Sequence, residues 1–234
     1  MIGPIAVAAA AGVAGYTYAA MAPGSQLFGR TIVAGRDPHE FALTFDDGPN
    51  DDYTVQLLEM LARHEVKATF FLIGKFVRQR PQLARAIHTA GHSVGNHTMS
   101  HPWLMLESPR RVREELAGCN AALEDALGEP VRLMRPPHGA RRPDVLRAAR
   151  DLGLTPVQWN AMGFDWQSGA TAAGIVEHLE RGIARNRRRG RGSNLLLHDG
   201  GHTAIGADRS QSIEATRIVL ERYRMRYVTV DAWA

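Results

Sequence analysis

The chain has 234 residues, of which 44% are hydrophobic and 22% charged, and its formal net charge is +4 at pH 7. This composition excludes a disordered or fibrous protein, and the length suits one sizeable domain. The mild basic charge is weak support for nucleic-acid binding, and no nucleic-acid motif accompanies it, so we expect no nucleic-acid partner. Cys119 is the only cysteine, which excludes an internal disulfide, and we expect it to be a small core residue.

Residues 2–21 contain no charged residue and are rich in alanine, glycine and valine. This is about the length of a membrane span, since roughly 20 apolar residues cross the hydrocarbon core. The positive start of a secretory signal is missing, although Ala20-Met21-Ala22 resembles a cleavage site. A membrane anchor, a cleaved signal and a buried or interfacial helix remain open. The first two place the domain outside the cytoplasm, membrane-anchored or secreted, with residues 1–22 as the hydrophobic segment, 23–40 as a linker and 41–234 as the domain.

After residue 40, short apolar runs alternate with amphipathic stretches, a pattern typical of βα units and a parallel sheet. The predicted strands are 41–45, 68–73, 93–95, 131–134, 155–159, 194–197 and 226–230. The predicted helices are 54–63, 78–89, 109–127, 143–152, 171–186 and 211–223.

This alternation is compatible with an incomplete (β/α) barrel or with an open doubly wound sheet. In a barrel, chemical groups collect at the C-terminal ends of many strands, whereas in an open sheet they gather at one switch point. Polar residues follow at least five of the predicted strands: Asp46-Asp47, Asn96-His97, Arg135, Asp165-Trp166 and His198-Asp199. The sequence therefore favours the barrel.

Two adjacent carboxylates, Asp46 and Asp47, end the first predicted strand, where each raises the cost of ionising the other. One of them can bind a cation that offsets its charge, while the other stays free as a proton acceptor. The alternative is helix capping, because Asp-Asp-Gly-Pro is also ordinary turn chemistry. Capping needs only one aspartate, however, and the helical pattern begins only near Thr54.

The segment HTMSH places His97 and His101 four residues apart. If it forms a single helical turn, both imidazoles face the same way, as metal ligands must. Pro102 disfavours helical backbone at His101, so such a turn would end there. Two histidines at this spacing often occur by chance, but a strand-end carboxylate nearby would complete a His2Asp site with an open position.

Five motifs, TFDDGP, HTMSH, RPPHG, the DW of GFDWQ and LLLHDG, resemble in order and spacing those of the polysaccharide deacetylases, which are carbohydrate esterase family 4 with the NodB homology domain. The resemblance extends from about residue 41 to 230. It implies an α/β fold, a single-domain distorted (β/α)7 barrel, and removal of N- or O-acetyl groups from sugars. It also implies one divalent metal ion, zinc first, with cobalt, nickel or manganese as alternatives.

Carried over position by position, the resemblance makes Asp46 the general base, and Arg135 would hold it ionised and oriented. The implied metal ligands are Asp47, His97 and His101. His198 would be the general acid, with Asp165 on its far nitrogen. Each pairing suits its role, because an arginine lowers the pKa of a carboxylate and a carboxylate raises that of a histidine.

The resemblance further implies that the backbone N–H of His138 stabilises the oxyanion, and that Trp166 and Leu196 wall a pocket for the acetyl methyl group. Two positions depart from the family pattern. Met162 stands where an aspartate is frequent, which makes the cleft wall less polar. His138 stands where a tyrosine is more usual, which bears on substrate contacts. Without the resemblance, Arg135 could be a surface residue, Trp166 a core residue and the segment 198–200 a plain turn.

We expect the substrate to be an N-acetylated glycan such as peptidoglycan or a chitin-type oligomer. The alternatives are an O-acetyl esterase acting on xylan or an exopolysaccharide, and a catalytically silent glycan-binding protein. The densest charge, residues 185–191, precedes the strand that ends in His198, so it should lie opposite the active site. A solvated helix end and contact with anionic lipid both remain open for this run.

Overall fold

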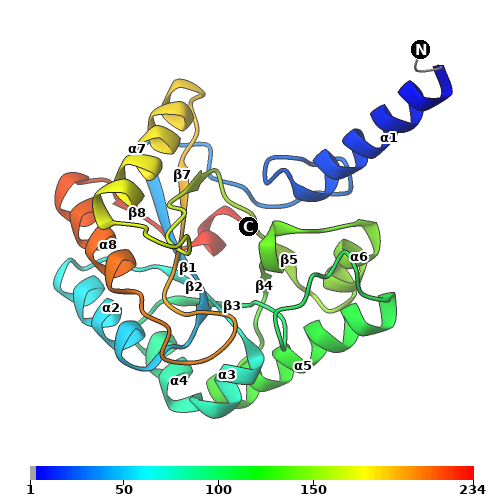
Figure 1. Cartoon of the computed structure of the whole chain (residues 1–234). Coiled ribbons are helices and arrows are strands. Elements are labelled where there is room, and N and C mark those ends of the chain that lie inside the picture. Colours follow the sequence, from blue (N-terminus) through cyan, green and yellow to red (C-terminus); the bar gives the residue numbers. More distant parts are fainter. Residues whose placement is uncertain (1–3) are drawn as a thin grey trace.

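The computed structural model describes residues 4–234, with side chains described from residue 12 onward. A parallel sheet occupies the centre, and helices pack around its outside (Figure 1). Seven strands follow the order β5-β4-β3-β2-β1-β7-β6, and β8 pairs with the start of β1. The strands are β1 (Glu40–Gly48), β2 (Thr69–Leu72), β3 (Ser93–Asn96), β4 (Leu133–Met134), β5 (Thr155–Pro156), β6 (Ala161–Met162), β7 (Ser193–His198) and β8 (Arg226–Tyr227).

Helices alternate with these strands along the chain, as the sequence predicts. They are α1 (Pro4–Met21), α2 (Asp51–Arg63), α3 (Gly74–Gln79), α4 (Pro81–Thr89), α5 (Pro109–Leu127), α6 (Pro143–Asp151), α7 (Ala172–Arg188) and α8 (Ser210–Arg222), with the 3-10 turns η1 (Pro137–Gly139) and η2 (Val230–Trp233). Prolines open α4, α5 and α6 at positions where no intrahelical N–H bond is lost. Ser108 and Thr171 cap α5 and α7 through their side-chain oxygens.

The sheet forms a barrel that stays open between β5 and β6. These strands are consecutive in the chain but lie at opposite ends of the strand order, with no pairing between them in the described residues. Ile32, from the segment before β1, adds an isolated parallel bridge to Val157 just after β5. The prediction of a single-domain, distorted (β/α)7 barrel is confirmed.

The structure differs from the predicted elements at three places that have a physical reason. β6 was not predicted, because two residues carry no readable periodicity. The predicted strand 226–230 contributes only two paired residues, beside the start of β1. The predicted helix 78–89 begins earlier and is interrupted at Arg80, because Pro81 disfavours helical backbone at the residue before it.

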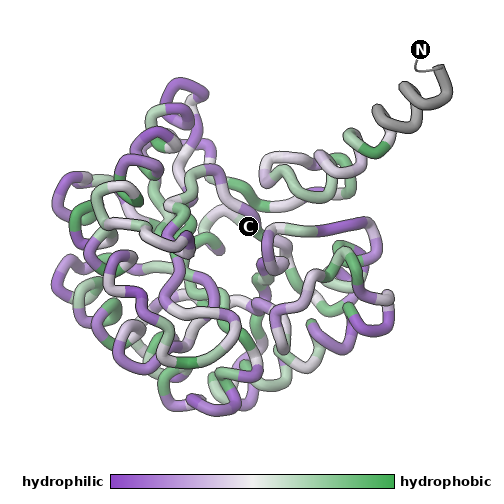
Figure 2. Tube along the Cα trace, viewed as in Figure 1, coloured by the Kyte–Doolittle hydropathy of each residue, from purple (hydrophilic) through white to green (hydrophobic). Residues whose placement is uncertain are grey.

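The core lies on both faces of the sheet. All nine residues of β1 are buried, as expected for a parallel strand covered on both sides. Phe45 and Phe70 stack across β1 and β2 with ring centroids 5.3 Å apart. Cys119, on α5, is fully buried, which confirms its expected core position. In Figure 2, hydrophilic segments lie mainly along the outer helices and loops.

The helix α1 projects away from the domain (Figure 1). Its C-terminal end is fixed by Arg141, a buried guanidinium that donates hydrogen bonds to the backbone carbonyls of Ala22 and Ser25 at 2.8 and 2.7 Å. On α1 itself, Val13 and Tyr16 are exposed. Within the part of the chain that the structure describes, no helix is both long enough and apolar enough to cross a bilayer.

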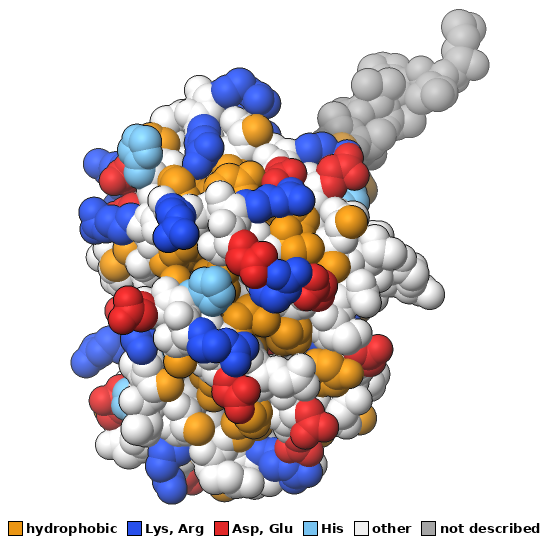
Figure 3. Space-filling view, turned by 90° about the vertical axis from the view of Figure 1, so that its left-hand side faces the viewer, with side chains coloured by type: hydrophobic (Ala, Val, Ile, Leu, Met, Phe, Trp, Pro, Cys, Tyr) orange, Lys and Arg blue, Asp and Glu red, His pale blue; other side chains and the backbone are white. Residues whose placement is uncertain are grey.

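The basic run 185–191 lies at the end of α7. The Arg187 guanidinium is 5.9 Å from the ring centroid of Phe41, at the start of β1. Because the site residues follow the other end of β1, the run lies away from them, as predicted. Figure 3 shows basic and acidic side chains interspersed over one outer face. The solvated helix end and the lipid contact both stay predictions.

Candidate active site

The C-terminal ends of β1, β3 and β7 bring carboxylate and imidazole side chains together. β1 pairs with β7 so that Asp46 lies opposite His198, and His97 directly follows β3. Gly200 leaves no room for a Cβ atom, which would overlap the backbone carbonyl of Asp47. The glycine of LLLHDG therefore lets the segment after β7 pack against the end of β1.

Asp47, His97 and His101 each offer one ligand atom, and these atoms lie within 4.8 Å of one another. Asp47 Oδ1 is 3.4 Å from His97 Nε2 and 3.2 Å from His101 Nε2. This carboxylate oxygen is buried and has no hydrogen-bond partner. A buried oxygen of this kind is costly unless a cation or a donor satisfies it. The donor set fits a divalent ion such as zinc, with coordination positions left for water or substrate.

The protonation of the triad also suits a cation. His97 Nδ1 lies 2.7 Å from the Arg135 carbonyl oxygen, so Nδ1 carries the hydrogen and Nε2 presents its lone pair. Burial lowers the pKa of His101 to about 2, which keeps this imidazole neutral. Burial alone would raise the pKa of Asp47, but the contact with His97 and the other nearby histidine side chains lower it. Metal ligands need these deprotonated forms.

The segment HTMSH is not helical, so the predicted single helical turn is wrong. Both imidazoles nevertheless face the same aspartate, because Thr98 and His101 adopt left-handed φ values of 67° and 64°. The Asn96 side chain accepts a hydrogen bond from the Thr98 amide at 2.8 Å, and Thr98 Oγ1 accepts one from the His101 amide at 3.0 Å. Ser100 donates through its amide and its hydroxyl to Glu115 on α5. These bonds hold an otherwise unfavourable backbone.

Arg135 forms the predicted pair with Asp46. The guanidinium is fully buried, and Nη1 donates to Asp46 Oδ1 at 2.7 Å and to Thr44 Oγ1 at 2.9 Å. The guanidinium carbon Cζ of Arg135 lies 4.2 Å from the Phe71 ring centroid. Burial lowers the pKa of Arg135, and the Asp46 charge opposes this, so the arginine stays a cation. Asp46 Oδ2 is left free of the arginine, 3.7 Å from His97 Nε2.

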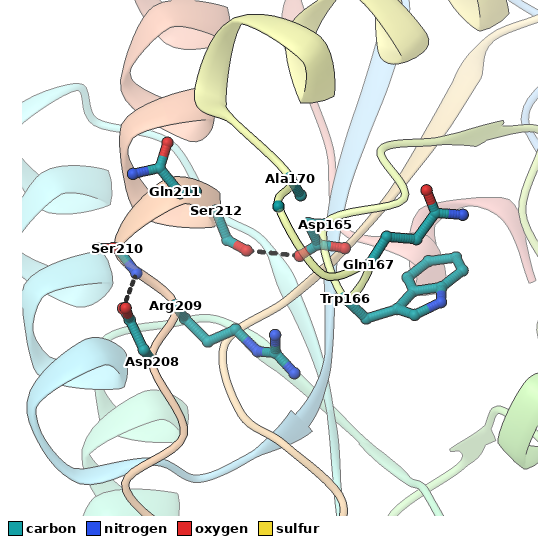
Figure 4. Close-up of a pocket in the computed structure, with 10 residues that line it drawn as sticks. Asp165, Trp166, Gln167, Ala170, Asp208, Arg209, Ser210, Gln211 and Ser212 are labelled. Carbon is teal, nitrogen blue, oxygen red and sulfur yellow. Dashed lines mark hydrogen bonds between the residues drawn. The ribbon is translucent and has the colours of Figure 1, made fainter.

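His198 and Asp165 form the second predicted pair. Asp165 Oδ1 lies 2.8 Å from His198 Nδ1, and Asp165 Oδ2 accepts a hydrogen bond from the His198 amide at 2.7 Å. Ser212 Oγ donates to Asp165 Oδ2 at 2.6 Å (Figure 4). Burial alone would lower the pKa of His198, but the charge and hydrogen bond of Asp165 outweigh it and raise the pKa to about 9. His198 is therefore a proton donor at neutral pH, with Nε2 as the free nitrogen.

The three predicted substrate-contacting residues are placed differently from one another. His138 has a left-handed φ of 59°, and its ring stacks on Trp103. Trp166 lies edge-on to the His198 ring at 5.2 Å and borders a pocket of about 160 Å³ with Asp165 and Ser212 (Figure 4). Leu196 is buried in β7 and does not line that pocket. That Leu196 and Trp166 together wall a pocket for the acetyl methyl group therefore stays a prediction.

Four residues near the site were not singled out from the sequence: Thr44, Trp103, His202 and Ser212. Thr44 opens the motif TFDDGP, which was the available signal for it. Ser212 carries no sequence signal, because serines are common and it lies far along the chain from Asp165. His202 stacks on His101 at 4.7 Å, and its Nδ1 lies 4.0 Å from Asp47 Oδ2. Trp103 follows HTMSH by two positions, which was the available signal for it.

Asp199, the residue after β7, makes hydrogen bonds that connect this strand end to α2. It is fully buried, and Thr54 Oγ1 donates to its Oδ2 at 2.5 Å. Its backbone carbonyl accepts a hydrogen bond from Asn50 Nδ2 at 2.8 Å. Burial raises the pKa of Asp199 to about 7, against the effect of Thr54. These contacts tie the residue after His198 to the start of α2.

The site combines three converging ligand atoms that fit a cation, a carboxylate beside a fixed positive charge, and an imidazole hydrogen-bonded to another carboxylate. A proton acceptor, a proton donor and a Lewis-acid site are the groups that hydrolysis of an acyl group needs.

Comparison with known proteins gives the site a family context. A family profile described as Polysaccharide deacetylase matches residues 34–157. A chitooligosaccharide deacetylase of Sinorhizobium fredii is 42% identical over 159 residues, covering 68% of this chain and 71% of the relative. A peptidoglycan-N-acetylglucosamine deacetylase of Bacillus cereus is 34% identical over 195 residues, covering 81% of this chain and 85% of the relative.

Solved structures are similar over most of the chain. A peptidoglycan N-acetylglucosamine deacetylase superposes with a TM-score of 0.76 at 29% identity, covering 86% of this chain and 91% of that chain. A carbohydrate esterase family 4 pseudoenzyme from Bacillus anthracis gives 0.73 at 26% identity, covering 87% and 68%. An acetyl xylan esterase of the same family from Clostridium thermocellum, in complex with cobalt, gives 0.69 at 27% identity, covering 82% and 89%. With the profile match over more than half of its length, the chain belongs to the polysaccharide deacetylase family of enzymes.

Proposed function

We propose that this enzyme is a divalent-metal-dependent deacetylase that removes N-acetyl groups from N-acetylated glycans of the peptidoglycan or chitin type. The observation that carries the proposal is the buried, unpartnered Asp47 Oδ1 between two imidazole nitrogens, with the Asp46–Arg135 and His198–Asp165 pairs in the same site. The named activities of the Sinorhizobium and Bacillus relatives support this substrate class.

A divalent ion held by Asp47, His97 and His101 would supply a Lewis acid that acidifies water and polarises the acetyl carbonyl. Asp46 would take the proton of the attacking water through Oδ2, because its Oδ1 is bound to Arg135. The His138 backbone N–H is the proposed donor to the oxyanion, as the family resemblance implies.

His198 completes the proposed reaction as the general acid. Its Nδ1 is bound to Asp165, so Nε2 is the nitrogen that donates a proton to the leaving group. An amine is a poor leaving group unless it is protonated, and a raised pKa keeps this proton in place at neutral pH. The products would be acetate and a free amino sugar.

An O-acetyl esterase is the same-chemistry alternative, and the structural similarity to an acetyl xylan esterase favours keeping it. A catalytically silent glycan-binding protein is the alternative of a different class, and the structural similarity to a pseudoenzyme of the family supports keeping it. The paired acid and base argue against a catalytically silent protein, because glycan binding alone does not require them.

The test is acetate release from N-acetylglucosamine oligomers, peptidoglycan and acetylated xylan. The protein is assayed after chelation and after return of zinc, cobalt, nickel or manganese. We expect release from the N-acetylated glycans, loss on chelation and recovery with metal. Release only from xylan would replace the proposal with the esterase. No release from any glycan by the metal-loaded protein would favour the binding protein.

We also propose that the domain works outside the cytoplasm, since peptidoglycan lies there, with residues 2–21 serving as membrane anchor or export signal. Cell fractionation and protease accessibility of the full chain test this. Recovery only in the soluble cytoplasmic fraction would contradict it.

A further inference from the structure

Trp103 is a large exposed aromatic residue beside the site that the proposed mechanism does not use. Its ring stacks on His138 with centroids 3.8 Å apart and planes inclined by 12°. The side chain is nevertheless 43% exposed. Since one face lies against the imidazole, the opposite face and the edges account for this exposure.

The Trp103–His138 stack is joined to the metal triad by direct contacts. The His138 ring lies edge-on to His101 with centroids 4.8 Å apart. Trp103 is also covalently close, because only Pro102 separates it from His101. A group lying on the outer face of Trp103 would therefore lie next to the reacting acetyl group, but outside the triad.

The loop that carries Trp103 is held by hydrogen bonds. The Leu106 amide donates to the Trp103 carbonyl at 2.8 Å, and Arg142 Nη1 donates to the Met105 carbonyl at 2.9 Å. Arg142 also donates to the carbonyl of Glu107. An exposed aromatic ring on a backbone fixed in this way binds a ligand with little loss of conformational entropy.

We propose that the outer face of Trp103 stacks on the pyranose ring of the sugar next to the one that loses its acetyl group. This deepens the proposed function and rests on it. A pyranose presents C–H groups on its faces, and these are complementary to the negative face of an indole ring. The site would then favour oligomers over the monomer, which has no neighbouring sugar.

The metal-loaded full chain is tested by measuring kcat and KM for N-acetylglucosamine and its oligomers up to the pentamer, because the monomer alone has no neighbouring sugar. For Trp103→Ala we expect kcat/KM on the oligomers to fall by about tenfold, through KM, with less than a twofold change on the monomer. Trp103→Phe should keep most of the preference. Leu106→Ala is the matched control, because Leu106 is 78% exposed on the same loop.

Two results would overturn the proposal. An equal loss at every chain length, in kcat, would mean that Trp103 only positions His138. An unchanged chain-length dependence would mean that the indole binds no sugar. Calorimetric titration of each variant with the pentamer measures binding of the sugar by Trp103 (the Trp103 platform) separately from turnover. If the wild-type protein releases no acetate but binds the pentamer about tenfold more tightly than Trp103→Ala, the proposed function fails while the platform stands.

Discussion

The two buried pairs of the site, Asp46 with Arg135 and Asp165 with His198, have nearly the same ion-pair distance, 2.7 and 2.8 Å. They differ in whether the cation can lose its proton. The guanidinium is permanently charged, so its hydrogen bond to Asp46 Oδ1 orients this carboxyl group at every working pH. The imidazole is titratable. Burial alone would lower its pKa, but Asp165 outweighs this effect and raises the pKa to about 9. One pair thus fixes a base, and the other stores a proton.

The strongest test of this contrast changes Asp46 to Asn. The variant loses the proton acceptor but keeps the polar shape, so we expect acetate release to fall on the order of 10³-fold. Bound metal, measured by elemental analysis, should stay at the wild-type amount. Asp47→Asn is the matched control and should lose the metal together with the activity. The reverse result would mean that the two aspartates have exchanged roles.

Removing the fixed cation tests the first pair through stability. Arg135→Met would leave the Asp46 charge buried without a partner, which lowers the free energy of unfolding by about 3–5 kcal/mol. Urea denaturation measures this loss. Adding Asp46→Asn to the same variant should restore part of it, because the unpaired charge is then gone. If the double variant is no more stable than the single one, the loss comes from packing against Phe71 instead.

Removing the carboxylate of the second pair tests the stored proton. In Asp165→Asn the pKa of His198 should fall, so the high-pH limb of the rate profile should move to lower pH. We expect about a 10²-fold loss of kcat at mildly alkaline pH and a smaller one at acidic pH. A metal ion also lowers this pKa, because like charges repel, so both proteins are compared with the same ion. Ser212→Ala, which keeps Asp165 on the imidazole, should move the limb only slightly.

The second pair also shows where sequence reasoning ends. The strand-end positions predicted that Asp165 and His198 converge, and the family resemblance implied their pairing, although 33 positions separate them. Ser212 completes this pair from α8, and nothing in its own neighbourhood along the chain indicates that role. Hydrogen bonds between distant segments depend on how the helices pack, which residue periodicity does not encode.

The metal triad was predicted as a set, but its backbone was not. A helical turn was expected between His97 and His101, whereas Thr98 and His101 take left-handed φ values. Glycine would have signalled such a conformation clearly, whereas threonine does not and histidine is only a weak indication. Of the hydrogen bonds that hold it, the one that Asn96 accepts is local, whereas those that Glu115 accepts come from α5, a tertiary contact. The candidate ligands were therefore predictable from residue types, their order and the family resemblance, while the strained loop that positions them was not.

The smallest expected effect is a difference in how the two pairs respond to alkaline pH. The folded-state pKa of His198 is raised above its ordinary value of 6.5 to about 9. The His198 pair therefore contributes stability that is fully present below about pH 6.5 and is lost as the pH rises through about 9. The contribution is on the order of 2–3 kcal/mol in chelated protein, and smaller with a cation bound. The Arg135 pair contributes no such loss in this range.

Urea unfolding of the chelated protein at several pH values between 6 and 10 measures this difference. In wild type the free energy of unfolding should decline across the window. In Asp165→Asn the decline should flatten, because the imidazole no longer gains a partner on folding. Ser212→Ala should keep most of it. An equal decline in wild type and Asp165→Asn would mean that His198 does not hold its proton through Asp165, and the contrast between the two pairs would then be lost.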